Sequence, residues 1–117
     1  MAKTMTTNES WAAKHRYARI SARKARLVMD TVRGLGCDQA LDVLRFDRHR
    51  ASGMITAVLT SAMANANEQE ADMGSLYVEE ARVDEGPYYR RWQPKDRGRA
   101  HPIAKRTSHL IVRVAER

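Results

Sequence analysis

Few side chains in this chain of 117 residues have the types and spacing that suit catalysis. Asp84 and Glu85 are adjacent carboxylates, but neighbouring residues of a strand point to opposite faces, so this pair would not converge on one substrate. Ser108 and His109 would act as nucleophile and base only with a third group placed to orient the histidine. We therefore expect no enzymatic activity and assign no catalytic residue.

The possible metal ligands are equally unpromising. Cys37 is the single cysteine, which excludes an internal disulfide and a multi-cysteine metal site. The histidines lack the short spacing of metal ligands; they are His15, His49, His101 and His109. We expect no metal and no cofactor. The N-terminus does not resemble a secretory signal, and no apolar stretch approaches the roughly 18 residues of a membrane span, so we expect a cytoplasmic protein that binds no membrane.

Basic residues are the side chains whose number and spacing do indicate a chemistry. The net charge is +7, and two segments, residues 14–26 and residues 87–109, each contribute +6 to it. Residues 87–109 hold seven basic residues against Asp96 alone, whereas residues 27–86 hold five arginines and eleven acids. Such segregation favours a polyanionic partner over a merely solvated surface. The other basic segment, residues 14–26, contains no acid. Its candidate binding residues are Lys14, Arg16, Arg19, Arg23, Lys24 and Arg26.

Local patterns predict the elements that position these residues. We expect a strand over residues 11–20, and then a helix with Ser21 as its N-cap and Gly34 at its C-terminal end. Arg23, Lys24, Arg26 and Arg33 would lie on the basic face of this helix, opposite a core stripe. The stripe follows the helical period and consists of Ala25, Val28, Met29 and Val32.

Two further helices are predicted downstream. Asp38 is the expected cap of a short helix ending at Phe46, and Asp47 is the expected start of the longest helix. The long helix has an uninterrupted apolar stripe: Ala51, Met54, Ile55, Val58, Leu59, Ala62, Met63 and Ala66. Small residues over 61–67 imply a close neighbour, and core packing against a sheet is the favoured explanation.

Residues 76–83 and 110–114 have strand-like patterns, and all three prolines fall between them. Because proline fits a strand only where its missing N–H is not needed, residues 84–109 form either a disordered loop or a long hairpin projecting beyond the core. This segment buries little apolar area, so a partner would have to offset the cost of ordering it. Tyr88, Tyr89 and Trp92 could stack on unpaired bases or pack at the hairpin base, and both interpretations stay open.

Several stretches occur in the order and spacing of a known family and together are specific. The chain resembles the bacterial form of the universal large-subunit ribosomal protein L twenty-two family over residues 14–115. The matching stretches are Ser21 to Val28, Arg33-Gly34, Gln39-Ala40-Leu41 with Leu44, Ser61 to Ala66, Val83 to Pro87, Pro94, Gly98-Arg99 and Lys105 to His109.

The resemblance implies an α+β fold, with three α-helices packed on a small antiparallel β-sheet and a long protruding β-hairpin. Residues 1–9 would be a flexible extension and residues 10–117 a single RNA-binding domain, with the hairpin at about 84–109. The implied partners are large-subunit (23S-type) rRNA, neighbouring large-subunit proteins and the nascent polypeptide. The implied functions are subunit assembly and lining of the peptide exit tunnel.

Residue by residue, the resemblance assigns rRNA binding to both basic segments. The residues so implied are Lys14, Arg16, Arg19, Arg23, Lys24, Arg26, Arg33, Arg90, Arg91, Lys105, Arg106 and His109. The tunnel-lining tip would consist of Pro94, Lys95, Asp96, Arg97, Gly98 and Arg99. Asp96 departs from the small neutral residue usual in the family, which puts local tunnel electrostatics and macrolide response in doubt. The rival hypotheses are a free-standing nucleic-acid chaperone or DNA-architectural protein, and a small hydrolase.

Overall fold

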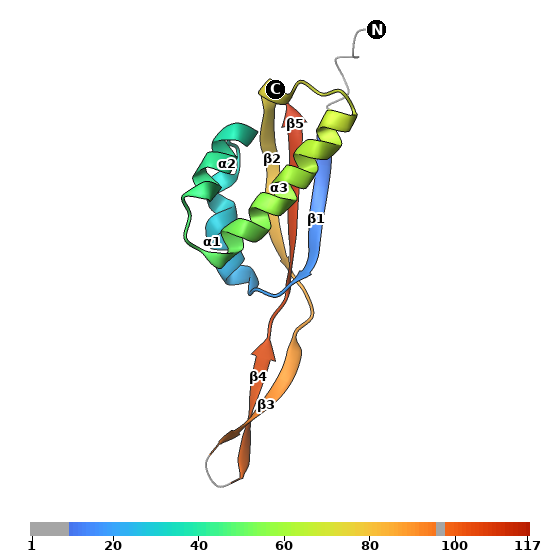
Figure 1. Ribbon diagram of the computed structural model, residues 1–117. Helices are drawn as coiled ribbons and strands as arrows, with labels where there is room; N and C mark the ends of the chain where they lie inside the picture. Colours follow the sequence, from blue (N-terminus) through green and yellow to red (C-terminus); the bar gives the residue numbers. More distant parts are fainter. Residues whose placement is uncertain (1–9, 96–97) are drawn as a thin grey trace.

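A three-stranded antiparallel sheet, covered on one face by three helices, forms the body of the protein (Figure 1). The computed structural model describes residues 10–95 and 98–117; residues 1–9, Asp96 and Arg97, which the sequence assigned to a flexible extension and to the tip, lie outside these ranges. The elements in chain order are β1 (Ser10–Ala18), α1 (Ala22–Val32), α2 (Cys37–Arg45), α3 (Arg50–Glu68), a 3-10 turn (Met73–Ser75), β2 (Leu76–Glu85), β3 (Tyr89–Lys95), β4 (Arg99–Lys105) and β5 (Ser108–Glu116). The predicted α+β class is confirmed.

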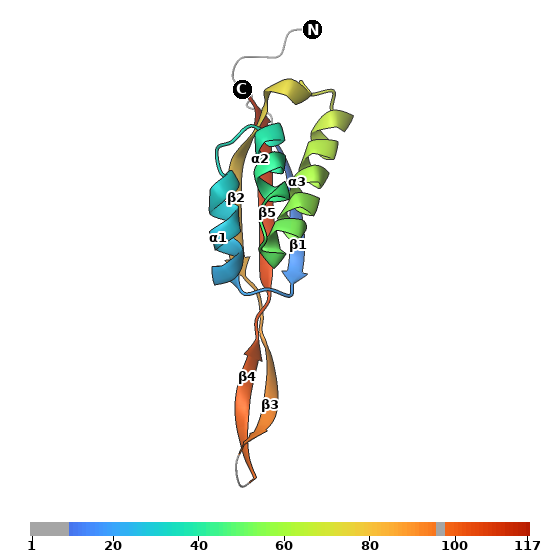
Figure 2. The ribbon, with the colours of Figure 1, turned by 60° about the vertical axis from the view of Figure 1, so that its left-hand side comes forward.

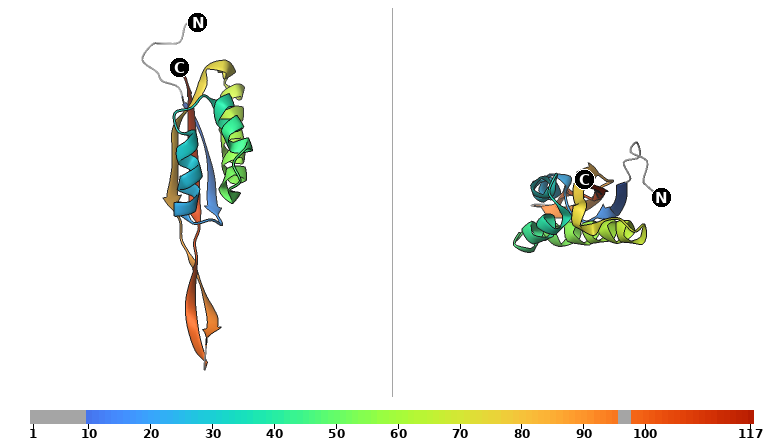
Figure 3. Two further views of the ribbon diagram at one scale, coloured as in Figure 1. Left: turned by 90° about the vertical axis from the view of Figure 1, so that its left-hand side faces the viewer. Right: turned by 90° about the horizontal axis from the view of Figure 1, so that it is seen from above.

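The last strand occupies the centre of the sheet, in the order β1-β5-β2. Both neighbours are antiparallel to β5, with Ala13 opposite Val112 in one pair and Val83 opposite Leu110 in the other. Leu110, Val112 and Val114 are at most 1% exposed, because the helices cover this face of the sheet. Viewed along the long axis, the helices form one layer and the strands a second (Figure 3).

Helix α1 follows its local sequence signals closely. Ser21 Oγ accepts a hydrogen bond from the backbone N–H of Lys24, which confirms Ser21 as the N-cap. The four predicted core residues are all buried: Ala25, Val28, Met29 and Val32. Gly34 adopts φ +83°, the left-handed conformation that commonly ends a helix.

The predicted starts of the other two helices are wrong by one to three residues. Helix α2 begins at Cys37, after Gly36, because Gly36 is held by a bridge to Tyr77 and its carbonyl accepts the N–H of Ala40. Asp38 therefore lies in the first turn of α2. Helix α3 begins at Arg50, because the Asp47 carboxylate closes a turn on the N–H of His49 before the helix starts.

The small residues of α3 lie where this helix crosses β1 and β5 (Figure 2). Ala62 and Ala66 are fully buried, and Asn65 Nδ2 donates a hydrogen bond to the carbonyl of Ala12 in β1 at 3.1 Å. Such an approach of a helix to a strand requires short side chains at the crossing. Packing against the sheet thus explains the small side chains of Ala62 and Ala66, whereas Ser61, Ala64 and Asn67 are exposed.

Strands β3 and β4 form a two-stranded hairpin that projects from the end of the body opposite the C-terminus (Figures 1 and 2). Lys95 pairs with Arg99, so the hairpin closes within the residues expected to form its tip, and Gly98 adopts φ +77° in this turn. Within the described ranges, β3 and β4 make no extensive contact with any helix or strand of the body. The radius of gyration is 17.9 Å, against about 13 Å for a compact chain of this length.

Replacing residues 88–105 with an Asn-Gly turn is therefore expected to leave a folded body. The free energy of unfolding should change by no more than about 1 kcal/mol, because the hairpin contributes little to the core and a shorter connection costs less to close. Urea unfolding followed by circular dichroism measures this. Loss of a cooperative transition would contradict the separation of body from hairpin.

Candidate nucleic-acid interface

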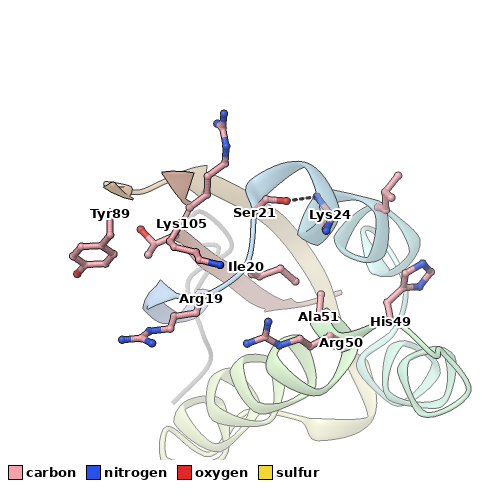
Figure 4. A pocket seen from close by; sticks show the side chains of 12 residues that line it. Arg19, Ile20, Ser21, Lys24, His49, Arg50, Ala51, Tyr89 and Lys105 are labelled. Atoms are coloured by element: carbon pink, nitrogen blue, oxygen red, sulfur yellow. Dashed lines mark hydrogen bonds between the residues drawn. The ribbon is translucent and has the colours of Figure 1, made fainter. Parts of the chain in front are cut away.

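A hollow of about 990 Å³ opens where the hairpin joins the body, and we name it the junction cleft (Figure 4). Its walls come from the loop after β1, the first turns of α1 and α3, and the base of the hairpin. Lys105 extends from the hairpin toward Ile20, and Tyr89 lies at the outer side of the cleft. Elements far apart in sequence thus enclose one space.

The junction cleft is strongly electropositive. Among its twelve lining residues, all of them described, none is Asp or Glu. Helices α1 and α3 both begin at the cleft, so their N-terminal partial positive charges add to those of the side chains. Fixed positive charge on several walls makes the cleft suited to phosphate groups. Five of the lining residues are cations: Arg19, Lys24, Arg50, Lys105 and Arg106.

Hydrogen bonds at the hairpin base fix the shape of the cleft. The N–H of Gly86 donates to the carbonyl of Thr107 at 3.0 Å, and Thr107 Oγ1 donates to the carbonyl of Pro87. Buried Ser108 donates from Oγ to the carbonyl of Ile20 at 3.0 Å. A Cβ at Gly86 would lie 2.7 Å from Thr107 Oγ1, so only glycine fits there without a shift. The hairpin therefore leaves the body in a defined direction.

The structure brings together four residues that the sequence placed in two separate basic segments. Arg19 and Lys24 face the same cleft as Lys105 and Arg106. Arg23 and Arg106 line a second hollow of about 480 Å³ next to it, which also contains Glu85. Lys14 and Arg16 lie exposed on β1 and line neither hollow.

Arg26 and Arg33 contact the protein's own backbone. Arg26 donates to the carbonyl of Val83 through Nε at 3.3 Å and Nη2 at 2.9 Å. Arg33 donates to the carbonyl of Ala81 through Nε at 3.1 Å and Nη2 at 2.5 Å, and pairs with Asp30 at 2.7 Å. Both guanidinium groups thereby satisfy carbonyls of β2, an edge strand of the sheet. Their observed contacts hold α1 against β2.

His109 is also engaged within the protein. Its Nδ1 accepts the N–H of Tyr17 at 3.1 Å, and the two rings meet edge to face with centroids 4.9 Å apart. Tyr17 has φ +58° at an irregularity of β1, so this contact ties the end of β1 to β5. A Cβ at Gly86 would come within 3.3 Å of the His109 ring. In this position His109, on β5, contacts residues of both β1 and β2.

The aromatic residues at the hairpin base are not packed in the core. Tyr88 is 51% exposed and Tyr89 is 47% exposed. Arg90 Nη2 donates to Tyr88 Oη at 3.4 Å, and this hydrogen bond lowers the pKa of the Tyr88 hydroxyl. For these two tyrosines the structure therefore favours availability over core packing. Arg91, Pro94, Lys95 and Arg99 lie on the hairpin strands, beyond the body.

Sequence reasoning missed His49 and Arg50, which line the cleft from the start of α3. Their segment belongs to the acidic middle of the chain, and its summed charge concealed a local run, Arg48-His49-Arg50. A helix start that presents two or three basic residues was the available signal. The displaced helix boundary at Asp47 obscured it.

Other chemistries find little support in the described part of the chain. No group of three His, Cys, Asp or Glu residues there could hold a metal ion, and no helix there is long and apolar enough to cross a membrane. Burial and the neighbouring Asp38 raise the pKa of the Cys37 thiol to about 11. This thiol therefore stays protonated at neutral pH and is a poor nucleophile.

A small α+β body that carries a basic cleft and a cationic two-stranded arm defines a class of polyanion-binding domain. The family model described as ribosomal protein L22p/L17e matches residues 13–115, and the chain belongs to this family. It is accordingly a structural, rRNA-binding protein of the large ribosomal subunit.

The contacts of α1 predict different consequences for two of its arginines. Arg26→Ala should lower the free energy of unfolding by about 1–2 kcal/mol, because the carbonyl of Val83 loses a charged donor. Arg23→Ala is the matched control: Arg23 is exposed on the same helix, so its loss should change stability by no more than about 0.5 kcal/mol. Urea unfolding of both variants provides the measurement, and equal stabilities would contradict a structural role for Arg26.

Proposed function

We propose that this chain fastens folded large-subunit rRNA at the junction cleft while its hairpin enters between RNA segments. The observation that carries the proposal is the convergence of five cations, with no carboxylate among the lining residues, at the point where the hairpin leaves the body. Contacts of this kind hold phosphates and read RNA shape more than base sequence.

The hairpin supports the proposal because the described part of it lacks extensive contact with the body. Its strands pair with one another and, within the described ranges, make no extensive contact with the helices and strands of the body, so the body does little to offset the repulsion among its arginines and lysines. RNA phosphates would remove that repulsion. Strands of seven residues extend about 23 Å, enough to reach well into a folded RNA.

The finer role follows from the family together with this geometry. The proposed function includes assistance in subunit assembly, contacts with neighbouring large-subunit proteins, and lining of the nascent-peptide tunnel by residues 94–99. Proline is compatible with the narrow ribbon, because each of its strands has one edge without a ladder partner. Asp96, within that proposed tip, would place a negative charge near the nascent polypeptide.

The cleft makes a specific prediction about affinity. Arg19→Ala should weaken binding to purified large-subunit rRNA and reduce the slope of log affinity against log salt by about 1, because one phosphate contact is lost. Arg82→Ala is the matched control: Arg82 pairs with Glu80 and Asp84 on the sheet and does not line the cleft. Binding titrations at several salt concentrations measure both variants. Equal slopes for Arg19→Ala and the wild-type chain would contradict the proposed role of the cleft.

Cosedimentation separates the proposal from a free-standing nucleic-acid chaperone. The full chain should remain on large subunits in moderate salt, whereas a chaperone held by phosphate contacts alone would dissociate. The variant with residues 88–105 replaced should incorporate poorly, since it keeps part of the cleft but loses the arm. Full incorporation of that variant would refute the role assigned to the hairpin.

A further inference from the structure

The linker between α2 and α3 displays an aromatic ring that the body does not use. Phe46, the C-cap residue of α2, is 83% exposed, the highest value among the large hydrophobic residues whose burial the structure describes. A phenylalanine so placed leaves most of its apolar surface in water, available for a contact outside the protein. Its neighbours Arg45 and Arg48 are exposed as well.

The linker is held in a defined conformation. The N–H of Asp47 donates to the carbonyl of Leu44 at 3.2 Å, and Asp47 Oδ1 accepts the N–H of His49 at 2.7 Å. Ser52 Oγ donates to the carbonyl of His49 at 2.7 Å. The ring is therefore presented on an ordered turn, which lowers the entropic cost of binding.

The acidic side chain of the linker is largely shielded from solvent, whereas its basic side chains are exposed. Asp47 is its single acid, and its side chain is only 14% exposed, directed to His49. The hydrogen bond from the His49 backbone lowers the pKa of this carboxyl, which keeps it ionised and occupied. The basic residues of the linker remain exposed, and the nearest exposed acid along the chain is Asp42, one turn earlier in α2.

We propose that Phe46 is a stacking platform for an unpaired RNA base, with Arg45 and Arg48 contacting the adjoining phosphates. The proposal rests on the RNA-binding function proposed above and adds a second contact to it. The linker leads directly into the junction cleft, where His49 and Arg50 are lining residues, so one RNA strand can reach both. A flat apolar ring with cations beside it is the arrangement that binds single-stranded nucleic acid.

A protein partner fits these surroundings less well. A stable protein interface usually covers about 800 Å² on each partner and has a contiguous, more apolar centre. Here the apolar surface next to Phe46 is small, since Val43, one turn earlier on α2, is only 36% exposed. An RNA base matches the isolated ring, whereas a protein surface would require a wider apolar area.

The test compares Phe46→Ala and Phe46→Trp in the full chain. The probes are a 12-nucleotide single-stranded RNA and the same strand annealed to its complement, with binding followed by fluorescence anisotropy across a salt series. Phe46→Ala should bind the single strand about 5-fold to 100-fold more weakly, with little change on the duplex. Its salt slope should equal that of the wild-type chain, because no charge is removed. Phe46→Trp should restore binding, since a larger ring still stacks.

Two further variants make the result specific. Arg48→Ala should weaken binding to both probes and lower the salt slope on the single strand by about 0.7, because it removes one phosphate contact. Val43→Ala removes a nearby apolar side chain and should bind both probes as the wild-type chain does. Thermal unfolding of Phe46→Ala should match the wild-type chain, given the exposure of the ring.

Three outcomes would overturn the proposal, and they differ in reach. Unchanged single-strand binding by Phe46→Ala, while Arg19→Ala still binds rRNA weakly, would remove the stacking platform alone. Equal losses of single-strand binding in Phe46→Ala and Val43→Ala would indicate a general apolar contact along α2 and would overturn stacking on the Phe46 ring. Failure of the wild-type chain to bind either probe or rRNA would remove both this inference and the RNA-binding function on which it rests.

Discussion

Repulsion among like charges at one end of the molecule is the constraint on which the rest of the structure depends. Five cations and the N-terminal ends of two helices surround the junction cleft, and further basic residues lie along the hairpin. On the sheet, by contrast, two arginines are paired within the protein: Glu80 pairs with Arg82 and Arg113, and Arg82 also approaches Asp84. The molecule is thus polarised, and a polyanion such as RNA would neutralise its basic end.

The body holds these charged residues in a defined arrangement. The central position of β5 connects the hairpin directly to the most deeply buried strand, so the direction of the arm is set by the core. Arg26 and Arg33 hold α1 against β2, which places the start of α1 at the cleft. Because the backbone that carries these cations is already ordered, RNA binding needs to order only their side chains, which favours recognition of RNA shape.

Elements specified by local signals were predictable from the sequence. Helix α1 has its cap at Ser21, its left-handed glycine at Gly34 and its buried stripe where the pattern placed them. Prolines and segregated charge together predicted an extension over residues 84–109, and the structure resolves the open choice in favour of a hairpin. The rest of the fold was predicted from the residues that match the family.

Features set by tertiary contacts were not predictable. Gly36 begins α2 because it is bridged to Tyr77, forty-one residues away in sequence, and no local pattern reports such a contact. For the same reason the partners of Arg26 and His109 could not be predicted: Arg26 donates to a carbonyl of β2, and His109 accepts an N–H of β1. The position of Arg50 in the cleft was not predicted, because the summed charge of a segment does not indicate which residues meet in space.

Hydrogen exchange of the backbone amides, in the free chain and on large-subunit rRNA, tests the central claim most directly. Amides of β3 and β4 should exchange rapidly in the free protein and become protected on RNA, while those of β5 stay protected in both states. Equal protection of hairpin and body in the protein without RNA would contradict the account.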